Sequence, residues 1–335
     1  MKIADISKDL GLSISTVSKA LNGYADVSEA TRELVMQRAR ELGYQPSASA
    51  RNLRRGRTDK IGLLINHSIV YISEYLTEIV AGAGYVAEQN GKNIILYMET
   101  VHHPEGIERI CRAREIDGAL LLWANPTSDT LRIFEDEGMP YILLGRRIDY
   151  EGASYIAPDN EDGAYRLTRH LIELGHTRIG FMARPVHGPT NTDRLEGYRR
   201  ALREANLRFD EQVVVTTKLE PSSGYYAMLQ LLDLHEPPTA VFAFYDLLAV
   251  DALRAAAERG VRVPEDVAIV GFDGLPSSLM TYPAITTAKQ PLQLMGRQAV
   301  EMLMERIEDN VLPPRRITLP IELLVRGSTI GRAVR

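Results

Sequence analysis

Residues 13–23 read SISTVSKALNG, and this stretch decides how the beginning of the chain is interpreted. It is nearly uncharged and places Ser13, Ser15, Thr16 and Ser18 within about two helical turns. Serine and threonine are mediocre helix formers, because their side chains compete for backbone hydrogen bonds. A helix that keeps so many hydroxyls needs them for something other than its own stability.

The neighbouring residues predict two helices joined by a tight turn. The first helix covers residues 3–10 and carries an apolar stripe. Gly11 supplies the turn, because glycine adopts left-handed backbone conformations at little cost. The second helix covers residues 14–21, where Val17 and Leu21 lie one turn apart and are expected to face inward.

A third helix is expected between an N-cap at Ser28 and a stop at Gly43. This order is typical of a helix-turn-helix, in which a helix, a glycine turn, a short helix and a third supporting helix follow one another. The second helix of this motif enters the DNA major groove. Short hydroxyls let such a helix sit deep in the groove and bond phosphates or base edges. An ordinary surface helix with incidental serines fits the same pattern, and this alternative stays open.

The next segment is basic. Residues 46–60, PSASARNLRRGRTDK, hold five Lys or Arg and one acid. Pro46 favours a short helix through Leu53, which is too short to be stable alone and is expected to order on its target. Leu53, a lone apolar residue among arginines, fits a wedge in a minor-groove step. A plain basic linker is the alternative.

Charge is distributed unevenly along the chain. Residues 1–60 carry 11 Lys and Arg against 7 Asp and Glu, a net of +4, whereas the remainder carries 28 against 37, a net of −9. A basic N-terminal segment followed by an acidic remainder fits a small polyanion-binding module attached to a larger domain. Chance alone also produces uneven charge, so this observation decides nothing by itself.

Bulk properties limit the class of protein. A chain of 335 residues suits two or three domains, and 45% hydrophobic residues is ordinary for a globular protein. The lone Cys111 excludes an internal disulfide framework. The charged beginning is no signal peptide, and the apolar runs are of strand length, so we expect a cytoplasmic protein without membrane contact.

From Lys60 onward, short apolar runs alternate with helical stretches, in two successive sets. This alternation predicts two α/β lobes built on parallel sheets, where ligands bind at the carboxyl ends of the strands. Polar residues at or near these strand ends are therefore ligand-binding candidates. They are Asn66, His67, Tyr75, Asn125, Arg146, Arg194, Tyr245, Asp246 and Asp273.

Other interpretations of several polar residues remain open. Asp159 fits a helix cap as well as a ligand contact, and Arg146 fits an ordinary surface charge. The tyrosines also fit the core or an interface. His102 and His103 are interpreted as a solvated loop pair, because they lack partners at helical spacing for a metal site. No metal and no cofactor are predicted.

Three stretches carry a family resemblance: IADISKDLGLSISTVSKALNG, VSEATRELVMQRARELGYQPSASARNLRRGRTDKIGLL and DNEDGAYRLTRHLIELGHTRIGFM. They resemble the LacI/GalR (lac repressor) family of bacterial transcriptional regulators, nearly from end to end. The resemblance implies base contacts by Ile14, Ser15 and Lys19. It implies phosphate contacts by Ser13, Thr16, Ser18 and Asn22, and hinge contacts in the minor groove by Ala50 and Leu53, with Arg54 beside them. Lys19 stands where many relatives have Arg, so operator preference does not carry over.

The same resemblance implies a domain plan and an effector site. It places a helix-turn-helix domain at 1–45, a hinge at 46–59 and a core like that of periplasmic binding proteins at 60–335. The core's N-lobe would comprise residues 60–157 and 290–318, and its C-lobe 158–289 and 320–335. Arg194 and Asp273 would hold hydroxyls or charges of an effector, most simply a sugar. The YISEYL run at 71–76 departs from the Asn-Pro-Phe-Phe of many relatives, so the effector's identity stays open.

The predicted function is a ligand-responsive repressor of carbohydrate uptake or catabolism genes. It binds a pseudo-palindromic operator as a homodimer, with no tail for a larger assembly. One rival is an exported binding protein without DNA function, and the other is an enzyme. The enzyme lacks support, because no phosphate loop, Gly-x-Ser-x-Gly or paired metal motif occurs. The operator, the effector and the sign of regulation stay undetermined.

Overall fold

The computed structural model describes residues 3–21, 24–44, 57–65, 73–98, 104–122, 126–185, 188–218 and 220–330. The chain divides into two compact units, Met1–Asp59 and Lys60–Arg335. Several predicted site residues lie outside the described residues, as does most of the predicted hinge helix. These residues are Asn22, Ala50, Leu53, Arg54, Asn66, His67 and Asn125.

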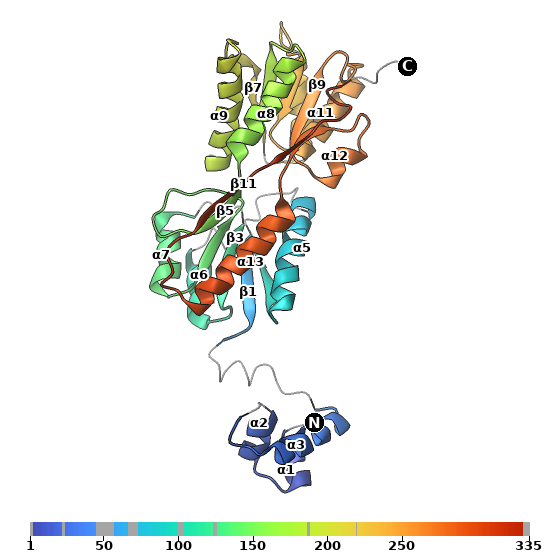
Figure 1. Ribbon diagram of the computed structural model, residues 1–335. Coiled ribbons are helices and arrows are strands. Elements are labelled where there is room, and N and C mark those ends of the chain that lie inside the picture. Colours follow the sequence, from blue (N-terminus) through green and yellow to red (C-terminus); the bar gives the residue numbers. More distant parts are fainter. Residues whose placement is uncertain are drawn as a thin grey trace. The chain divides into compact units, whose positions relative to one another are not determined.

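The described residues of the first unit form three helices, α1 (Ile3–Leu10), α2 (Ile14–Leu21) and α3 (Glu29–Glu41) (Figure 1). Helix α3 begins at the N-cap Ser28, whose Oγ accepts a hydrogen bond of 3.3 Å from the backbone NH of Thr31. Gly11 has a φ of +62°, the left-handed conformation that the tight turn after α1 requires. The predicted helix-turn-helix is confirmed.

A single small core holds these three helices together. Its buried members are Ile6, Val17, Ala20, Val27, Val35 and Ala39. The expectation that Leu21 turns fully inward is only partly met, because Ala20 takes the buried place and Leu21 packs at the edge. Residues 17 and 20 are three apart and share one helix face, whereas Leu21 is the last helical residue.

The second unit contains two six-stranded sheets, which define its two lobes. The first lobe has the strand order β11-β5-β4-β3-β1-β2, and each of its pairings is parallel. Its strands are β1 (Lys60–Ile65), β2 (Asn93–Met98), β3 (Gly118–Leu122), β4 (Tyr141–Leu144), β5 (Tyr155–Pro158) and β11 (Arg316–Leu319). All five residues of β3 are buried, as expected for a strand covered on both faces.

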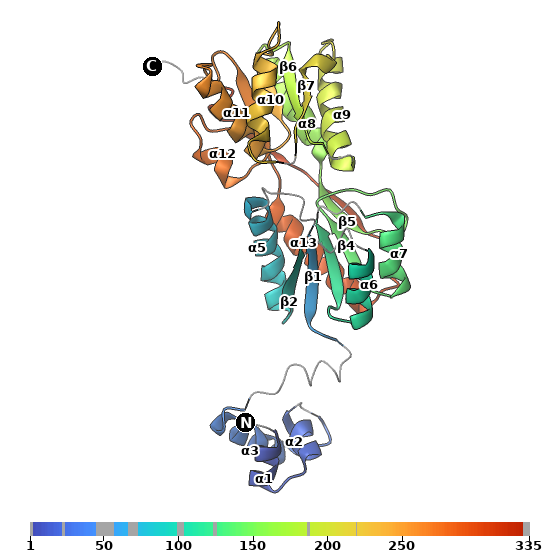
Figure 2. The ribbon, with the colours of Figure 1, turned by 180° about the vertical axis from the view of Figure 1, so that it is seen from behind.

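Helices cover both faces of this sheet (Figures 1 and 2). Leu63 belongs to the core under α5 (Ser73–Gln89) and α13 (Leu292–Glu308), whereas the next residue, Leu64, packs against the opposite helices. These are α6 (Pro104–Ala113) and α7 (Ser128–Asp136). The alternation follows from the two-residue period of a strand.

The second lobe has the strand order β12-β10-β9-β8-β6-β7. Its strands are β6 (Ile179–Ala183), β7 (Val214–Thr216), β8 (Ala240–Ala243), β9 (Ala268–Asp273), β10 (Thr286–Lys289) and β12 (Glu322–Leu324). β12 runs antiparallel to β10, and the other described pairs are parallel. The helices are α8 (Asn160–Glu173), α9 (Pro189–Glu204), α10 (Ser223–Leu232), α11 (Asp246–Glu258) and the short α12 (Pro276–Met280).

One expected strand begins later than its sequence suggests. The run EQVVVTT starts with a 3₁₀ turn, Glu211–Val213, and only Val214–Thr216 joins the sheet. The cause is Asp210, whose Oδ1 accepts a hydrogen bond of 2.9 Å from the backbone NH of Gln212. A capping carboxylate of this kind favours a turn over an extended strand.

The chain passes between the two sheets three times. It leaves the first sheet after β5 to form α8, returns after β10 to form α13, and leaves again between β11 and β12. Two α/β lobes with parallel sheets therefore follow the helix-turn-helix, as the fold prediction states. Among the described residues, no helix is both long enough and apolar enough to span a membrane.

Candidate functional sites

The outer surface of α2 carries most of the residues predicted to contact DNA. Ile14 is 52% exposed, and Ser13 and Ser15 are exposed beside it. The Oγ of Ser13 accepts a hydrogen bond of 3.0 Å from the backbone NH of Thr16, and the two hydroxyls lie 2.8 Å apart. Ser13 therefore caps the helix while its hydroxyl stays at the surface, where a phosphate can reach it.

Lys19 lies on the same helix and forms an ion pair with Asp26. The hydrogen bond from Lys19 lowers the pKa of Asp26 below its usual value. Both side chains are partly or fully exposed, and surface ion pairs of this kind are weak in water. Lys19 can therefore exchange Asp26 for a DNA phosphate or a base edge.

In the second unit, Arg194 is buried at the carboxyl end of the second sheet. It is 3% exposed, and each of its nitrogens donates one hydrogen bond. Nε donates to Asn160 Oδ1 at 2.9 Å, Nη2 donates to Asp273 Oδ1 at 3.3 Å, and Nη1 donates to the carbonyl oxygen of Phe244. The guanidinium carbon lies 3.6 Å from the ring centroid of Phe272. Stacking and hydrogen bonds together fix its orientation.

Asp273 ends β9 and connects Arg194 to the other lobe. Its Oδ1 also accepts a hydrogen bond of 2.6 Å from Gln290 Nε2. Tyr75 on α5 of the first lobe donates to Gln290 Oε1 at 3.3 Å. Burial raises the pKa of Asp273 to about 6, against the opposing effects of Arg194 and of the hydrogen bond from Gln290. A buried hydrogen-bond chain therefore links the two lobes at the strand ends.

Asp246, the first residue of α11, is completely buried. Its Oδ2 accepts a hydrogen bond of 2.7 Å from the backbone NH of Leu275, and its Oδ1 accepts one of 2.6 Å from the Thr287 hydroxyl. Burial and the nearby charge of Asp273 raise the pKa of Asp246 to about 8. These contacts tie α11 to the segment after β9 and to β10, so Asp246 positions Asp273.

Two further arginines lie at strand ends, one in each lobe. Arg146 follows β4 closely and is 7% exposed, and Arg184 directly follows β6 and is half-buried. Burial and the like charge of Arg184 lower the pKa of Arg146 to about 10. Burial also lowers the pKa of Arg184, against the attraction of Tyr245 and Asp273. The positive charge of Arg184 in the second lobe therefore acts on Arg146 in the first lobe.

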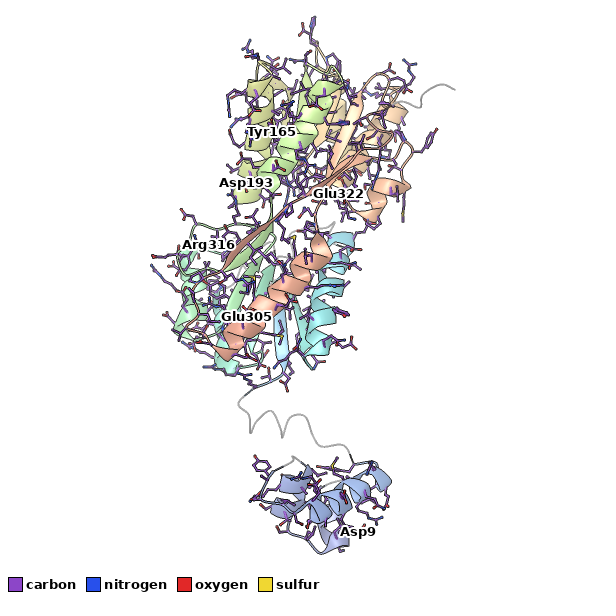
Figure 3. The ribbon with its side chains drawn as sticks, in the orientation of Figure 1. Asp9, Tyr165, Asp193, Glu305, Arg316 and Glu322 are labelled. Atoms are coloured by element: carbon purple, nitrogen blue, oxygen red, sulfur yellow. The ribbon has the colours of Figure 1, made fainter. Side chains whose placement is uncertain are left out.

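A bidentate ion pair makes a second direct connection between the lobes. Arg147, after β4, donates from Nε to Asp193 Oδ2 at 3.2 Å and from Nη2 to Oδ1 at 2.6 Å. Figure 3 shows Asp193 at the end of α9 nearest the first lobe. A pocket of about 450 Å³ lies beside this pair, lined by residues of both lobes that include Asp159 and Thr318.

Comparison with known proteins assigns the family. Residues 2–47 match the family described as "Bacterial regulatory proteins, lacI family", and residues 168–329 match the "Periplasmic binding protein-like domain". The chain is 36% identical over 324 residues to the HTH-type transcriptional regulator CelR of Thermobifida fusca, which covers 95% of each chain. It belongs to the LacI family of transcriptional regulators.

Other LacI-family proteins resemble the whole chain. The transcriptional repressor PurR of Actinobacillus pleuropneumoniae serotype 3 is 33% identical over 333 residues, 97% of each chain. A solved CelR–cellobiose complex has a TM-score of 0.76 at 33% identity, and it covers 98% of this chain and 99% of its own. A lac repressor dimer bound to operator and an anti-inducer has a TM-score of 0.87 at 25% identity and 99% coverage of both chains. This LacI-family chain is a transcriptional regulator and not an enzyme.

The structure brings together most of the described residues that were predicted to bind effector. Arg194 and Asp273 are bonded to each other, and Tyr75 reaches them through Gln290. Tyr245 stands at the N-cap of α11, with its ring 6.2 Å from that of Phe244. Their contact with an effector stays a prediction. Asp159 caps α8 by accepting a hydrogen bond of 3.0 Å from the NH of Asp162.

The candidate list from sequence lacks two residues that the structure adds to this LacI-family site, Arg184 and Gln290. Arg184 directly follows β6 and Gln290 directly follows β10, so the rule that selects polar residues at strand ends selects them too. Asn160 begins α8 where the chain crosses between the lobes, and its contact with Arg194 depends on tertiary packing.

Proposed function

We propose that this protein is a ligand-controlled repressor of genes for carbohydrate uptake or catabolism. The observation that carries the proposal is the buried network of Arg194, Asp273, Asn160 and Gln290, which Tyr75 joins to the first lobe. A sugar hydroxyl both donates and accepts, so it suits an arginine donor beside a carboxylate acceptor. The cellobiose in the CelR complex supports a saccharide effector.

The DNA-binding half of the proposal depends on α2. Its exposed residues Ile14 and Ser15 would contact base edges, with Lys19 freed from Asp26 beside them. The hinge residues Ala50, Leu53 and Arg54 would enter the minor groove, as the sequence predicts. Two copies would pair on a pseudo-palindromic operator, and the lac repressor dimer on its operator supports this arrangement.

Effector control would act through the angle between the lobes. An effector that contacts Arg194 and Tyr75 touches both lobes, and it therefore favours one lobe arrangement over another. Because β1 of the first lobe continues directly from the hinge, a change in that lobe's position alters where the two hinge segments of a dimer meet. A coupling free energy of about 1–3 kcal/mol is enough for a useful switch.

Gel-shift and calorimetry experiments test the two halves separately. The full chain and a truncation lacking residues 1–58 are compared on DNA from the promoter next to the gene. The truncation is expected to lose DNA binding and keep effector binding, because the second unit has its own cores. Loss of both activities, or DNA binding by the truncation, contradicts the proposal.

A ligand panel tests the effector class. Calorimetry with monosaccharides and disaccharides, cellobiose among them, is expected to show binding by one of them. Purine bases are included because PurR relatives share 33% identity with the chain. Binding of a purine or an amino acid, with no response to any saccharide or saccharide derivative, would leave the DNA-binding role intact and overturn the carbohydrate assignment.

A further inference from the structure

Arg184 has features that the hydrogen-bond network around Arg194 does not use. Its Nε is buried and has no hydrogen-bond partner in the structure, and its guanidinium carbon lies 5.9 Å from the ring centroid of Phe244. The same ring lies 4.4 Å from the guanidinium carbon of Arg194. Arg184 and Arg194 therefore both lie near one aromatic ring, and each nitrogen of Arg194 donates to the protein whereas Nε of Arg184 does not.

Asn191 on α9 contributes a buried hydrogen-bond acceptor near Arg184. Its Nδ2 donates to the carbonyl oxygen of Arg184 at 3.4 Å, while its Oδ1 is buried without a hydrogen-bond partner in the structure. Buried polar atoms in folded proteins nearly always have partners. A donor on Arg184 and an acceptor on Asn191, both buried and unsatisfied, fit a ligand that offers both an acceptor and a hydroxyl donor.

The charge balance at this place is positive. Arg146 from the first lobe and Arg184 from the second influence each other as like charges, and Arg194 adds a third cation. Asp273 is the carboxylate that opposes them, and it already bonds Arg194. The segments that follow β1, β3 and β6, residues 66–72, 123–125 and 186–187, contain no Asp or Glu.

We propose that the effector carries an anionic group, a carboxylate or a phosphate monoester, that lies between Arg146 and Arg184. This inference builds on the proposed function, because it specifies the chemical class of the effector of that same site. An anion between the two guanidiniums attracts both of them, and these attractions offset the repulsion between the two arginines. The planar guanidinium of arginine also matches the geometry of a carboxylate or a phosphate. A neutral sugar leaves the repulsion between Arg184 and Arg146 uncompensated. The effector is therefore a sugar acid or a sugar phosphate.

Matched ligand pairs test the charge requirement on the full chain. Calorimetry compares cellobiose with cellobionate, and glucose with glucuronate and glucose 6-phosphate. An acid or phosphate is expected to bind about tenfold or more tightly than its neutral parent, and added salt is expected to weaken only the charged ligand. The preferred member of the panel distinguishes a carboxylate effector from a phosphate effector. A neutral sugar that binds as tightly as its charged partner overturns the inference.

A second measurement does not depend on the choice of sugar. The thermal midpoint of the full chain is measured in inorganic phosphate and in sodium chloride at equal ionic strength. Phosphate is expected to raise the midpoint of the wild-type protein and of Arg262→Gln, a matched control in an exposed ion pair with Asp266. Arg184→Gln is expected to lose that increment. Equal increments in the wild type and in Arg184→Gln, or no increment in either, refute the anion site.

The failure of this inference is distinguishable from failure of the proposed function. A gel shift with the full chain that succeeds while all charged ligands fail to bind refutes only the anion site. Charged ligands that bind while no promoter DNA is bound refute the repressor and leave the anion site standing.

Discussion

At the scale of single residues, Arg194 and Asp273 in the candidate effector site are buried charges that compensate each other. Arg194 donates to Asn160, Asp273 and a backbone carbonyl, and Asp273 also accepts from Gln290. Removing one partner of a buried pair leaves an uncompensated charge, and this costs more than the pair contributes. The site residues therefore also hold the second lobe together, so stability and binding must be measured separately.

Arg194→Met is expected to lower the free energy of unfolding by about 3–5 kcal/mol, because Asp273 stays buried without its cation. The double variant Arg194→Met, Asp273→Asn is expected to be less destabilised than the sum of the two single changes, with a coupling on the order of 1–3 kcal/mol. Urea unfolding of the four proteins measures this cycle. Strictly additive losses would show that the two side chains do not interact.

The buried carboxyls Asp246 and Asp273 predict a pH dependence of stability. Their pKa values in the folded protein are about 8 and about 6, against 3.8 in an unfolded chain. The folded state therefore binds more protons than the unfolded state within this window, and stability falls as pH rises from about 4 to about 8. Below that window the contribution is fully present.

Asp246→Asn is expected to flatten the dependence of the unfolding free energy on pH between these limits. The asparagine amide can donate to the hydroxyl of Thr287, and its oxygen can accept from the backbone NH of Leu275. Urea titrations of wild type and variant at a series of pH values provide the comparison. Identical slopes in the two proteins would mean that Asp246 does not titrate in this range.

At the scale of elements, glycines set how closely the helices of the second unit pack. A Cβ at Gly82 of α5 would lie 2.0 Å from the carbonyl oxygen of Gln293 on α13, and one at Gly296 of α13 would lie 2.3 Å from that of Ile79 on α5. The contacting atoms belong to the backbone and cannot move aside. Helices α8 and α9 pack in the same way at Gly197, where an added Cβ would lie 2.2 Å from a backbone carbonyl oxygen.

Gly82→Ala is expected to destabilise the protein by about 1–3 kcal/mol or more, because it forces α5 away from α13. Gly84 provides a matched control on the same helix, since a Cβ there meets no atom within 4 Å. Gly84→Ala is expected to stabilise the protein by up to about 1 kcal/mol through helix propensity. Thermal midpoints measure both changes, and similar shifts for the two variants would contradict the packing argument.

The sequence predicts a hinge helix from Pro46 through Leu53, which lies outside the described residues. Leu53→Ala is expected to weaken binding to the specific operator by about 1–3 kcal/mol, the scale of one lost specificity contact. Binding to non-specific DNA is expected to change little, because that binding depends on phosphate charge. Fluorescence anisotropy with operator and scrambled duplexes makes the comparison. An equal loss on both duplexes contradicts a wedge role for Leu53.

At the scale of the whole molecule, several connections among the described residues join the two lobes. One runs from Tyr75 through Gln290 to Asp273, another is the ion pair between Arg147 and Asp193, and in a third the backbone NH of Ser277 donates to Glu74 Oε2. Because Asp193 and Arg194 are neighbours on α9, a ligand that moves Arg194 also moves the residue that holds the other lobe. The lobes and the effector site are therefore mechanically coupled.

Reciprocal coupling is the prediction at this scale. If the effector changes operator affinity, then operator DNA changes effector affinity by the same factor, which we expect to be about 5–150-fold. Calorimetry of the effector with and without saturating operator duplex measures this factor, and anisotropy of the operator with and without effector measures its counterpart. An effector affinity that operator DNA leaves unchanged would show that the protein is not a switch.

The sequence by itself determined the features that depend on local spacing. Hydroxyls after Gly11 and the apolar period of three short helices predict the helix-turn-helix, and alternation of apolar runs with helices predicts two parallel-sheet lobes. The strand-end rule also selects Arg146, Tyr245 and Asp273 as candidates. The predictions of the helix-turn-helix and of the two lobes succeed because helix and strand periods are properties of neighbouring residues.

Tertiary structure alone decided which polar residues are partners and which are buried. Gln290 reaches Asp273 and Tyr75 from distant parts of the sequence, and Asn160 meets Arg194 only because α8 packs on α9. Asp246 accepts hydrogen bonds from Leu275 and Thr287, and its contact with an effector stays a prediction. The like charges of Arg146 and Arg184 come from different lobes. Burial and long-range pairing depend on how the sheets and helices pack, which no local spacing encodes.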